Sequence, residues 1–403
     1  MPLDNLFHIQ NKTAQDILNS YSSGLLPQSL LFYGPKNSGR LTGAMDLSFF
    51  LTGDEDKRDI LRSNSIIYLP SREMSGRIRT ALELFKTQRT RSARLFLIES
   101  IRLALMQYHP ALSASATSTS SSYFSLSGEI DEVLLNLEDD RDYSDKEINE
   151  IVKSLDRCLD PRFLYCGKKS PSTVTIDQIR AVQEYFSQLG EEKVVVFENV
   201  EDATDGAKNS LLKMLEEPEE KSHMILLSSN PQKLLETILS RVRKFQFPPL
   251  GEKKTASLIK EKFGVWEEYP SFDSFFFEKG SGEEARKEFD RDLNAVSEAL
   301  ISSKPLVGEN EEEILSSLEK LSAWSHFVES LLYLLEKAWK EGRINSINAK
   351  RKAEILNSYT ISTDVYNMGP RMAFDLLLRE GNQCQIDYLG GCLKIFLHAL
   401  KRS

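Results

Sequence analysis

Two short apolar runs, separated by a helical pattern, stand out in the middle of the chain. Residues 194–197 and 224–227 are rich in Val, Ile and Leu and have the length of buried strands. Between them, leucines recur at helical spacing over residues 207–216, and Pro218 ends that pattern. A strand, a helix and a second strand at this spacing predict a crossover unit and therefore a parallel sheet.

Polar side chains follow both predicted strands. Glu198 and Asn199 come directly after the first strand, and Ser228, Ser229 and Asn230 follow the second. In open parallel sheets, ligands bind beyond the carboxyl ends of the strands. The pattern therefore predicts a site at this edge, either functional or degenerate.

The N-terminal part of the chain carries a strand, a glycine-rich turn and a helix in succession. The strand is predicted at residues 29–33 and the helix ends near Leu51. The turn between them consists of Gly34, Pro35, Lys36, Asn37, Ser38, Gly39, Arg40 and Leu41. This order of elements is the context that a phosphate-binding loop requires.

The turn matches the GxxxxGK[ST] pattern only in its two glycines. Arg40 replaces the lysine that reaches the phosphates, and Leu41 replaces the hydroxyl residue that holds Mg²⁺. Backbone N–H groups at the helix start could still bind an anion weakly, but we expect no Mg-nucleotide chemistry. A merely structural turn is the alternative, and the agreement of strand, loop and helix favours a degenerate phosphate-binding loop.

Further patterns complete the first domain. Residues 66–69 and 245–247 are predicted strands, residues 176–188 a helix, and residues 234–243 a short helix. Prolines at 248 and 249 then mark a domain boundary.

Residues 72–170 interrupt this domain as an insertion. A basic helical part is followed by a serine-rich stretch at 113–127, predicted to be a flexible linker, and by an acidic helical part at 129–160. The basic part could contact DNA, but no aromatic residues interleave with it for base stacking. We favour the alternative that the basic and acidic helices pack on each other or face solvent.

The rest of the chain has a helical pattern throughout. Residues 250–303 predict two or three helices, and residues 304–403 predict a separate helical bundle of ordinary domain size. The expected fold class is therefore α/β, a parallel sheet flanked by helices, followed by a small helical domain and an all-α C-terminal domain.

Composition excludes several classes of protein. The net charge of −9 means that any contact with nucleic acid must be a local patch. We expect a cytoplasmic protein, because no apolar run is long enough for a bilayer and the first residues are unlike a secretory signal. No metal site is expected, since the histidines are scattered and the cysteines lack zinc-site spacing and are read as free thiols. The cysteines are Cys158, Cys166, Cys384 and Cys392.

Several motifs in order resemble the clamp-loader branch of the AAA+ proteins. They are NSLLKMLEEP at 209–218, ILLSSNP at 225–231, ILSR at 238–241, and IDQIR at 176–180, which is similar to bacterial members. The strand and loop at 29–40 are also similar, so the resemblance covers about 1–70 and 171–250. It implies a AAA+ P-loop-type domain at 1–249, a lid at 250–303 and a collar domain for oligomerisation at 304–403.

The resemblance also implies that this chain has lost the chemistry of its motor relatives. Arg40 and Leu41 stand in the loop, and Glu198 and Asn199 form a degenerate Walker B pair where active members carry two acidic residues. Ser229 falls at the sensor-1-like position. We therefore expect no intrinsic ATPase and no cofactor of its own, with ATP bound by a neighbouring subunit.

One group that acts on ATP is retained. Ser240, Arg241 and Val242 fall where the family has its Ser-Arg-Cys motif. The resemblance implies that Arg241 is an arginine finger acting in trans, since a guanidinium can stabilise charge on phosphate oxygens. The alternative is a surface arginine favoured by a helix C-terminus.

Partners also follow from the resemblance. A hetero-oligomeric ring would contain clamp-loader ATPase subunits and a clamp-opening subunit. It would contact the sliding clamp indirectly and primer-template DNA through the whole complex, as part of a DNA polymerase holoenzyme and with no membrane. Two other functions stay open: a divergent active ATPase motor, and a AAA+-derived DNA-binding protein whose insertion carries the DNA.

Overall fold

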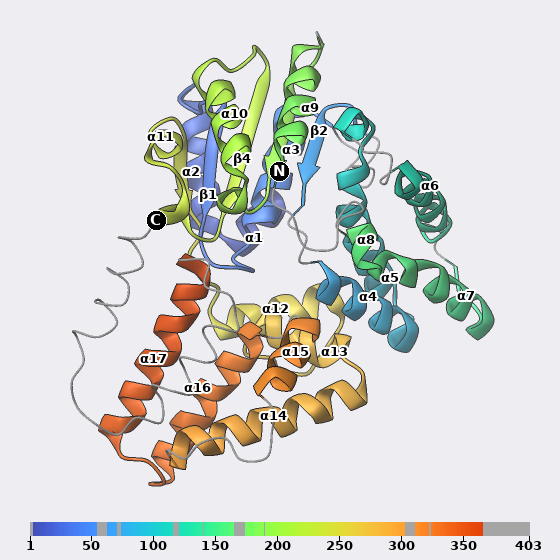
Figure 1. The fold of residues 1–403 in the computed structure, drawn as a ribbon. Helices are drawn as coiled ribbons and strands as arrows, with labels where there is room; N and C mark the ends of the chain where they lie inside the picture. The colour runs from blue at the N-terminus through green and yellow to red at the C-terminus, as the bar shows by residue number, and fades with distance from the viewer. Residues whose placement is uncertain are drawn as a thin grey trace. The chain divides into compact units, whose positions relative to one another are not determined.

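The computed structural model forms two compact units, which divide after Glu283 (Figure 1). It describes residues 3–54, 63–70, 74–115, 121–139, 141–164, 174–188, 190–302, 311–321 and 324–365. Residues 250–283 thus belong to the first unit, together with the predicted nucleotide-binding-like domain. The proposed bounds of lid and collar stay predictions.

A parallel sheet of five strands organises the first unit. Its strands are β1 (Ser29–Tyr33), β2 (Ile66–Leu69), β3 (Lys193–Phe197), β4 (Ser222–Ser228) and β5 (Arg243–Gln246). They lie in the order β2-β3-β4-β1-β5, and every neighbouring pair is parallel. All five strands were predicted from the sequence, and the parallel sheet is confirmed.

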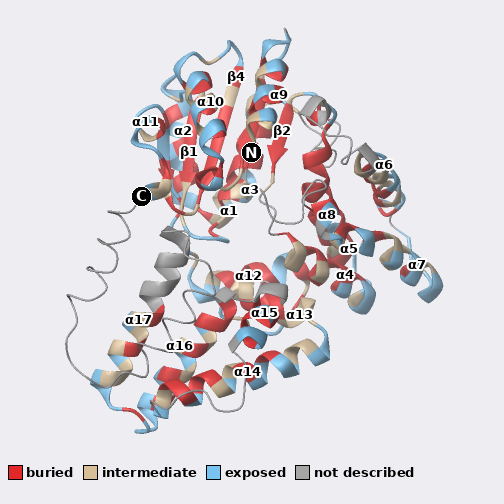
Figure 2. Cartoon of the chain, viewed as in Figure 1, coloured by how far each residue is buried: buried red, intermediate tan, exposed pale blue. Residues whose placement is uncertain are grey.

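The strands bury side chains on both faces because successive residues point to opposite sides. On β1, Leu30 and Phe32 enter a large core on one face, and Leu31 enters a small core on the other. In Figure 2 most of β1, β2 and β4 is coloured as buried, whereas the edge strand β5 has three exposed residues. Two-sided burial explains why these segments read as continuous apolar runs.

Helices cover both faces of the sheet (Figure 1). Those contributing to the large core include α1 (Asp4–Ile9), α2 (Asn11–Ser22) and α3 (Arg40–Thr52). The small core is closed by α9 (Ile176–Ser187), α10 (Asp205–Glu216) and α11 (Glu236–Leu239). The structure corrects the helix predicted at 234–243, because α11 is one turn and Arg243 already begins β5.

The insertion is helical. It contains α4 (Ser75–Gln88), α5 (Arg91–Leu105), α6 (Ser121–Asn136), α7 (Asp145–Leu155) and α8 (Pro161–Leu164). The prediction of a flexible linker at 113–127 is wrong at 113–115, where a 3-10 helix (Pro110–Ser115) ends, and from Ser121 onward, where α6 begins. Tyr123, Phe124 and Leu126 pack against the large core, so apolar burial overrides the serine-rich composition. Residues 116–120 lie outside the described part.

Ion pairs join the basic and acidic parts of the insertion. Arg102 Nη1 lies 2.7 Å from Glu138 Oε1, and the Arg102 side chain is almost fully buried. Arg89 Nη1 lies 2.6 Å from Asp145 Oδ1 at the start of α7. These contacts confirm that the two parts pack on each other.

The large core also joins the insertion to the helices that follow the sheet. These are α12 (Glu252–Phe263) and α13 (Phe272–Gly280). The rings of Phe96 on α5 and Phe263 on α12 are 4.3 Å apart, and Phe263 stacks on Phe275 at 5.0 Å. Thr80 Oγ1 donates to the Phe276 carbonyl at 2.8 Å. A Cβ on Gly280 would lie only 2.6 Å from Thr80 Oγ1, so the two helices approach closely here.

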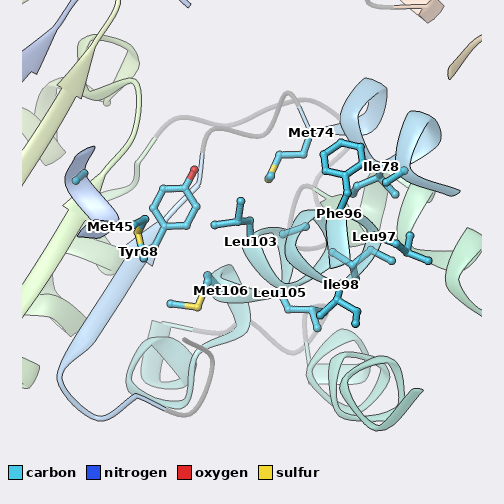
Figure 3. Packing of buried hydrophobic residues seen from close by; sticks show 14 of the residues in the cluster. Met45, Tyr68, Met74, Ile78, Phe96, Leu97, Ile98, Leu103, Leu105 and Met106 are labelled. Carbon is cyan, nitrogen blue, oxygen red and sulfur yellow. The ribbon is translucent and has the colours of Figure 1, made fainter. Parts of the chain in front are cut away.

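The same core reaches the sheet. Figure 3 shows Tyr68 of β2 and Met45 of α3 beside Leu103 of α5 and Met106. The insertion is therefore packed against the sheet through this shared core.

The second unit is helical over its described residues. It contains α14 (Glu283–Ser302), α15 (Glu311–Leu321), α16 (Trp324–Lys340) and α17 (Ser346–Val365). Phe289 of α14 stacks on His326 of α16 at 5.1 Å between ring centres. The helical character of this region is as predicted, and the helices expected beyond residue 365 lie outside the described part.

Candidate functional site

The glycine-rich loop connects β1 to α3 in a tight environment. Gly34 donates its N–H to the Ser228 carbonyl at 3.2 Å, and a Cβ there would lie 2.0 Å from the Phe247 carbonyl oxygen. Gly39 has a positive φ of 92°, and a Cβ on it would lie 2.8 Å from Ile9 Cγ2. The backbone itself requires both glycines, whether or not a phosphate binds.

The junction between α1 and α2 lies against this loop. Gln10 Nε2 donates to the Ser38 carbonyl at 3.0 Å and to the Pro248 carbonyl at 2.7 Å, and the Gln10 side chain is buried. Pro35, Lys36 and Asn37 form the exposed tip of the loop. One amide therefore ties the loop to the N-terminal segment and to the end of the sheet.

Arg40, the first residue of α3, is directed into the protein. Its side chain is 7% exposed, and Nη1 has no hydrogen-bond partner among the described residues. Burial lowers the pKa of the Arg40 guanidinium, and the carboxylates of Glu201 and Glu198 oppose this shift. Arg40 stands where a phosphate-binding loop has its lysine. Its charge therefore lies in the electrostatic field of this chain's own carboxylates.

Glu198 directly follows β3, as predicted, and both its carboxylate and its N–H are bound by other groups of this chain. Its carboxylate accepts a short hydrogen bond from the Tyr68 hydroxyl, and its N–H donates to the Leu69 carbonyl at 3.1 Å. Burial, followed by the Glu198 charge, raises the pKa of Tyr68 well above its usual value. Asn199 follows in the left-handed region with φ 50°, which an asparagine tolerates better than most residues.

Glu201 is a site residue that the sequence analysis missed. It is 5% exposed, and its Oε1 accepts from the N–H and the hydroxyl of Ser229, both at 2.8 Å. It also accepts from the Asn230 N–H at 3.2 Å. The sensor-1-like serine is therefore bound to a carboxylate that follows β3, and this contact links the ends of β3 and β4.

These contacts do not fit a bound Mg-nucleotide. Leu41 supplies no oxygen for a metal, and Asn199 cannot act as a base. Arg40 is buried, and the charges of Glu201 and Glu198 raise its pKa against the effect of that burial. Among the residues that the structure describes, no cluster of His, Cys, Asp and Glu could hold a metal ion.

Arg241 lies two residues after α11. Its contacts are with residues other than Arg40, Glu198, Glu201 and Ser229. Nη2 lies 2.7 Å from Glu216 Oε1, and Nη1 donates to the Thr237 carbonyl at 2.8 Å. The Arg241 side chain is 34% exposed. Val242, in the place of the motif's cysteine, packs into the small core, so the change leaves the local packing apolar.

The structure thus brings together Arg40, Glu198, Ser229 and the unpredicted Glu201, and it leaves Arg241 on the surface. Of the cysteines, Cys158 is buried and free, and burial raises its pKa to about 12. Cys166, Cys384 and Cys392 lie outside the described residues. None of the described helices is long and apolar enough to cross a bilayer.

Comparison with known proteins points to one family over part of the chain. A family model described as "DNA polymerase III, delta subunit" matches residues 123–251. The delta' subunit of DNA polymerase III from Bacillus subtilis is 43% identical over 88 residues, which are 21% of this chain and 27% of that protein. The delta' subunit from Escherichia coli is 36% identical over 98 residues, or 24% and 29% of the two chains.

A solved structure is similar over a longer stretch but weakly. It is a DNA polymerase III gamma subunit-related protein from Thermotoga maritima, 20% identical, covering 56% of this chain and 89% of that chain with a TM-score of 0.28. A TM-score this low does not establish a common fold.

The matched segments span less than a third of the length of the two delta' relatives. Over that part of its length, the chain resembles the delta-prime subunit of bacterial DNA polymerase III, within the clamp-loader family that its motifs indicate.

Proposed function

We propose that this chain is a non-catalytic, delta-prime-like subunit of a cytoplasmic bacterial sliding-clamp loader that acts in DNA replication. It would form part of a hetero-oligomeric ring with ATPase subunits and a clamp-opening subunit. Its own nucleotide site is closed, and it supplies Arg241 to the ATP site of a neighbour.

The observation that carries this proposal is the contrast between two arginines. Arg40, in the loop, is buried, and the negative charges of Glu201 and Glu198 favour its charged form against the effect of burial on its pKa. Arg241 is partly exposed and is held by surface groups only. A cation that serves phosphate on another subunit must reach the surface, and one that is buried against carboxylates balances internal charge.

The packing around the insertion supports a rigid member of the ring. In the first unit, the predicted lid helices α12 and α13 share aromatic packing with α4 and α5. Thr80 adds a hydrogen bond from α4 to α13. Elements fixed by a shared core do not rearrange at low cost, which suits a subunit without a nucleotide cycle.

Arg241→Ala in a reconstituted loader tests the proposal. We expect the ring to assemble and its clamp- and DNA-stimulated ATP hydrolysis to fall, at most by the order of 10³–10⁵-fold that arginine fingers contribute elsewhere. Only the ATP site adjoining this subunit should be affected, so the loss in the whole ring's rate depends on how far the sites act together.

Arg243→Ala is the matched control, because Arg243 is also exposed and lies two residues further on. It should leave the hydrolysis rate close to that of the unmodified ring. Unchanged hydrolysis in the Arg241→Ala ring, with assembly verified by gel filtration, would refute the proposed finger.

A further inference from the structure

The contact between Arg241 and Glu216 joins two segments that lie far apart in the sequence. Glu216 is the last residue of α10, and Arg241 follows α11. Glu216 Oε1 lies 2.7 Å from Arg241 Nη2. A carboxylate at a helix C-terminus is disfavoured by the helix dipole, so Glu216 gains from a cationic partner at this position.

A second contact fixes the other side of the guanidinium. Nη1 donates to the Thr237 carbonyl at 2.8 Å, and to Ser240 Oγ at 3.4 Å. The group is therefore held at both terminal nitrogens, one by its own helical turn and one by α10. Two such contacts restrict the rotation of a side chain that would otherwise sample many rotamers.

The contacts leave a usable edge of the guanidinium. Arginine has five N–H donors, and the hydrogen bonds of Arg241 are made by Nη1, while Nη2 forms the ion pair with Glu216. The Nε–H and Nη2–H groups make no hydrogen bond with the described residues. Two donors on one guanidinium are what bidentate recognition of a phosphate requires.

We propose that Glu216 is a positioning residue for Arg241, holding its guanidinium so that free donors face the phosphate of a neighbouring subunit. This inference rests on the proposed function, because it assigns Glu216 a role only if Arg241 acts in trans. The Glu216 side chain is 49% exposed, so the contact orients Arg241 without burying its charge.

The size of the expected effect follows from this exposure. Exposed ion pairs contribute little to stability, so Glu216→Gln should leave the fold and the ring intact. It should slow the kcat of clamp-stimulated ATP hydrolysis by about two- to fivefold, with the KM for ATP nearly unchanged. The KM is spared because this chain does not hold the nucleotide that is hydrolysed.

Glu217→Gln provides a matched control. Glu217 is the next residue, is also exposed and has no ion pair among the described residues. Removing its charge changes the charge of the chain equally but leaves Arg241 untouched. We expect no change in the rate.

A double-mutant cycle in the reconstituted loader closes the test. If Glu216 acts through Arg241, then Glu216→Gln slows hydrolysis in a ring that retains Arg241. The same substitution has no further effect in a ring that already carries Arg241→Ala. Equal rates for Glu216→Gln and Glu217→Gln, or slowing that persists in the Arg241→Ala ring, would overturn the inference while leaving the finger in place. No effect of Arg241→Ala alone would instead overturn the proposed function, and the inference with it.

Discussion

Single residues decide what the site can do. Arg40 keeps the positive charge of a phosphate-binding lysine, yet it is buried, and the charges of Glu201 and Glu198 act on it. Leu41 packs against the large core where a metal-binding hydroxyl would stand. The same backbone geometry thus remains while the ligand chemistry is replaced by internal charge balance.

Arg40→Ala tests this charge balance directly. We expect the variant to lose about 2–4 kcal/mol of free energy of unfolding, because it leaves the buried carboxylate of Glu201 without a nearby cation and opens a cavity. Urea denaturation monitored by circular dichroism measures the loss. Arg40→Lys keeps the charge and should lose clearly less. Equal midpoints for Arg40→Ala and the unmodified chain would contradict the role given to Arg40.

At the scale of elements, the sequence predicted the parts whose apolar pattern is simple. The strands were found because both faces of the sheet are covered, so residues such as Val194–Phe197 form unbroken apolar runs. The loop was found from Gly34 and Gly39, which the backbone requires.

Other features had no local signal. Glu201 is one acid among several after β3, and only the fold brings it to Ser229. The start of α6 was missed because serine-rich composition conceals Tyr123 and Phe124, whose burial depends on a distant core. The packing of α5 against α12 joins segments more than 150 residues apart in sequence, so periodicity within either helix cannot predict it.

Phe263→Ala tests whether the insertion and the helices after the sheet form one core. Phe263 is buried between Phe96 and Phe275, so we expect a loss of about 3–5 kcal/mol in the free energy of unfolding. Hydrogen exchange should also accelerate in α4 and α5, although the mutation is in α12.

Trp266→Ala is the control for that experiment. Trp266 follows α12 and is 77% exposed, and the Lys260 ammonium lies over its ring. Removing the Trp266 side chain should therefore lower the free energy of unfolding by about 1 kcal/mol or less. If exchange in α4 and α5 were the same in both variants, the idea of a shared core would fail.

At the scale of the whole molecule, the proposed function separates two tasks that a motor subunit combines. At the strand ends, Glu201 binds Ser229, Glu198 binds Tyr68, and Arg40 is buried within the electrostatic field of both carboxylates. The surface keeps Arg241, held by Glu216. We therefore propose that this chain's own nucleotide site is closed while its Arg241 serves the site of another subunit.

Titration of the purified full-length chain with Mg-ATP, with released phosphate followed in the same samples, tests that claim most directly. We expect no turnover by the lone chain and no binding tighter than about 1 mM, the weak end of ordinary substrate affinities. Saturable binding at micromolar Mg-ATP, with turnover that Arg40→Ala abolishes, would contradict it and would identify the chain as a divergent motor.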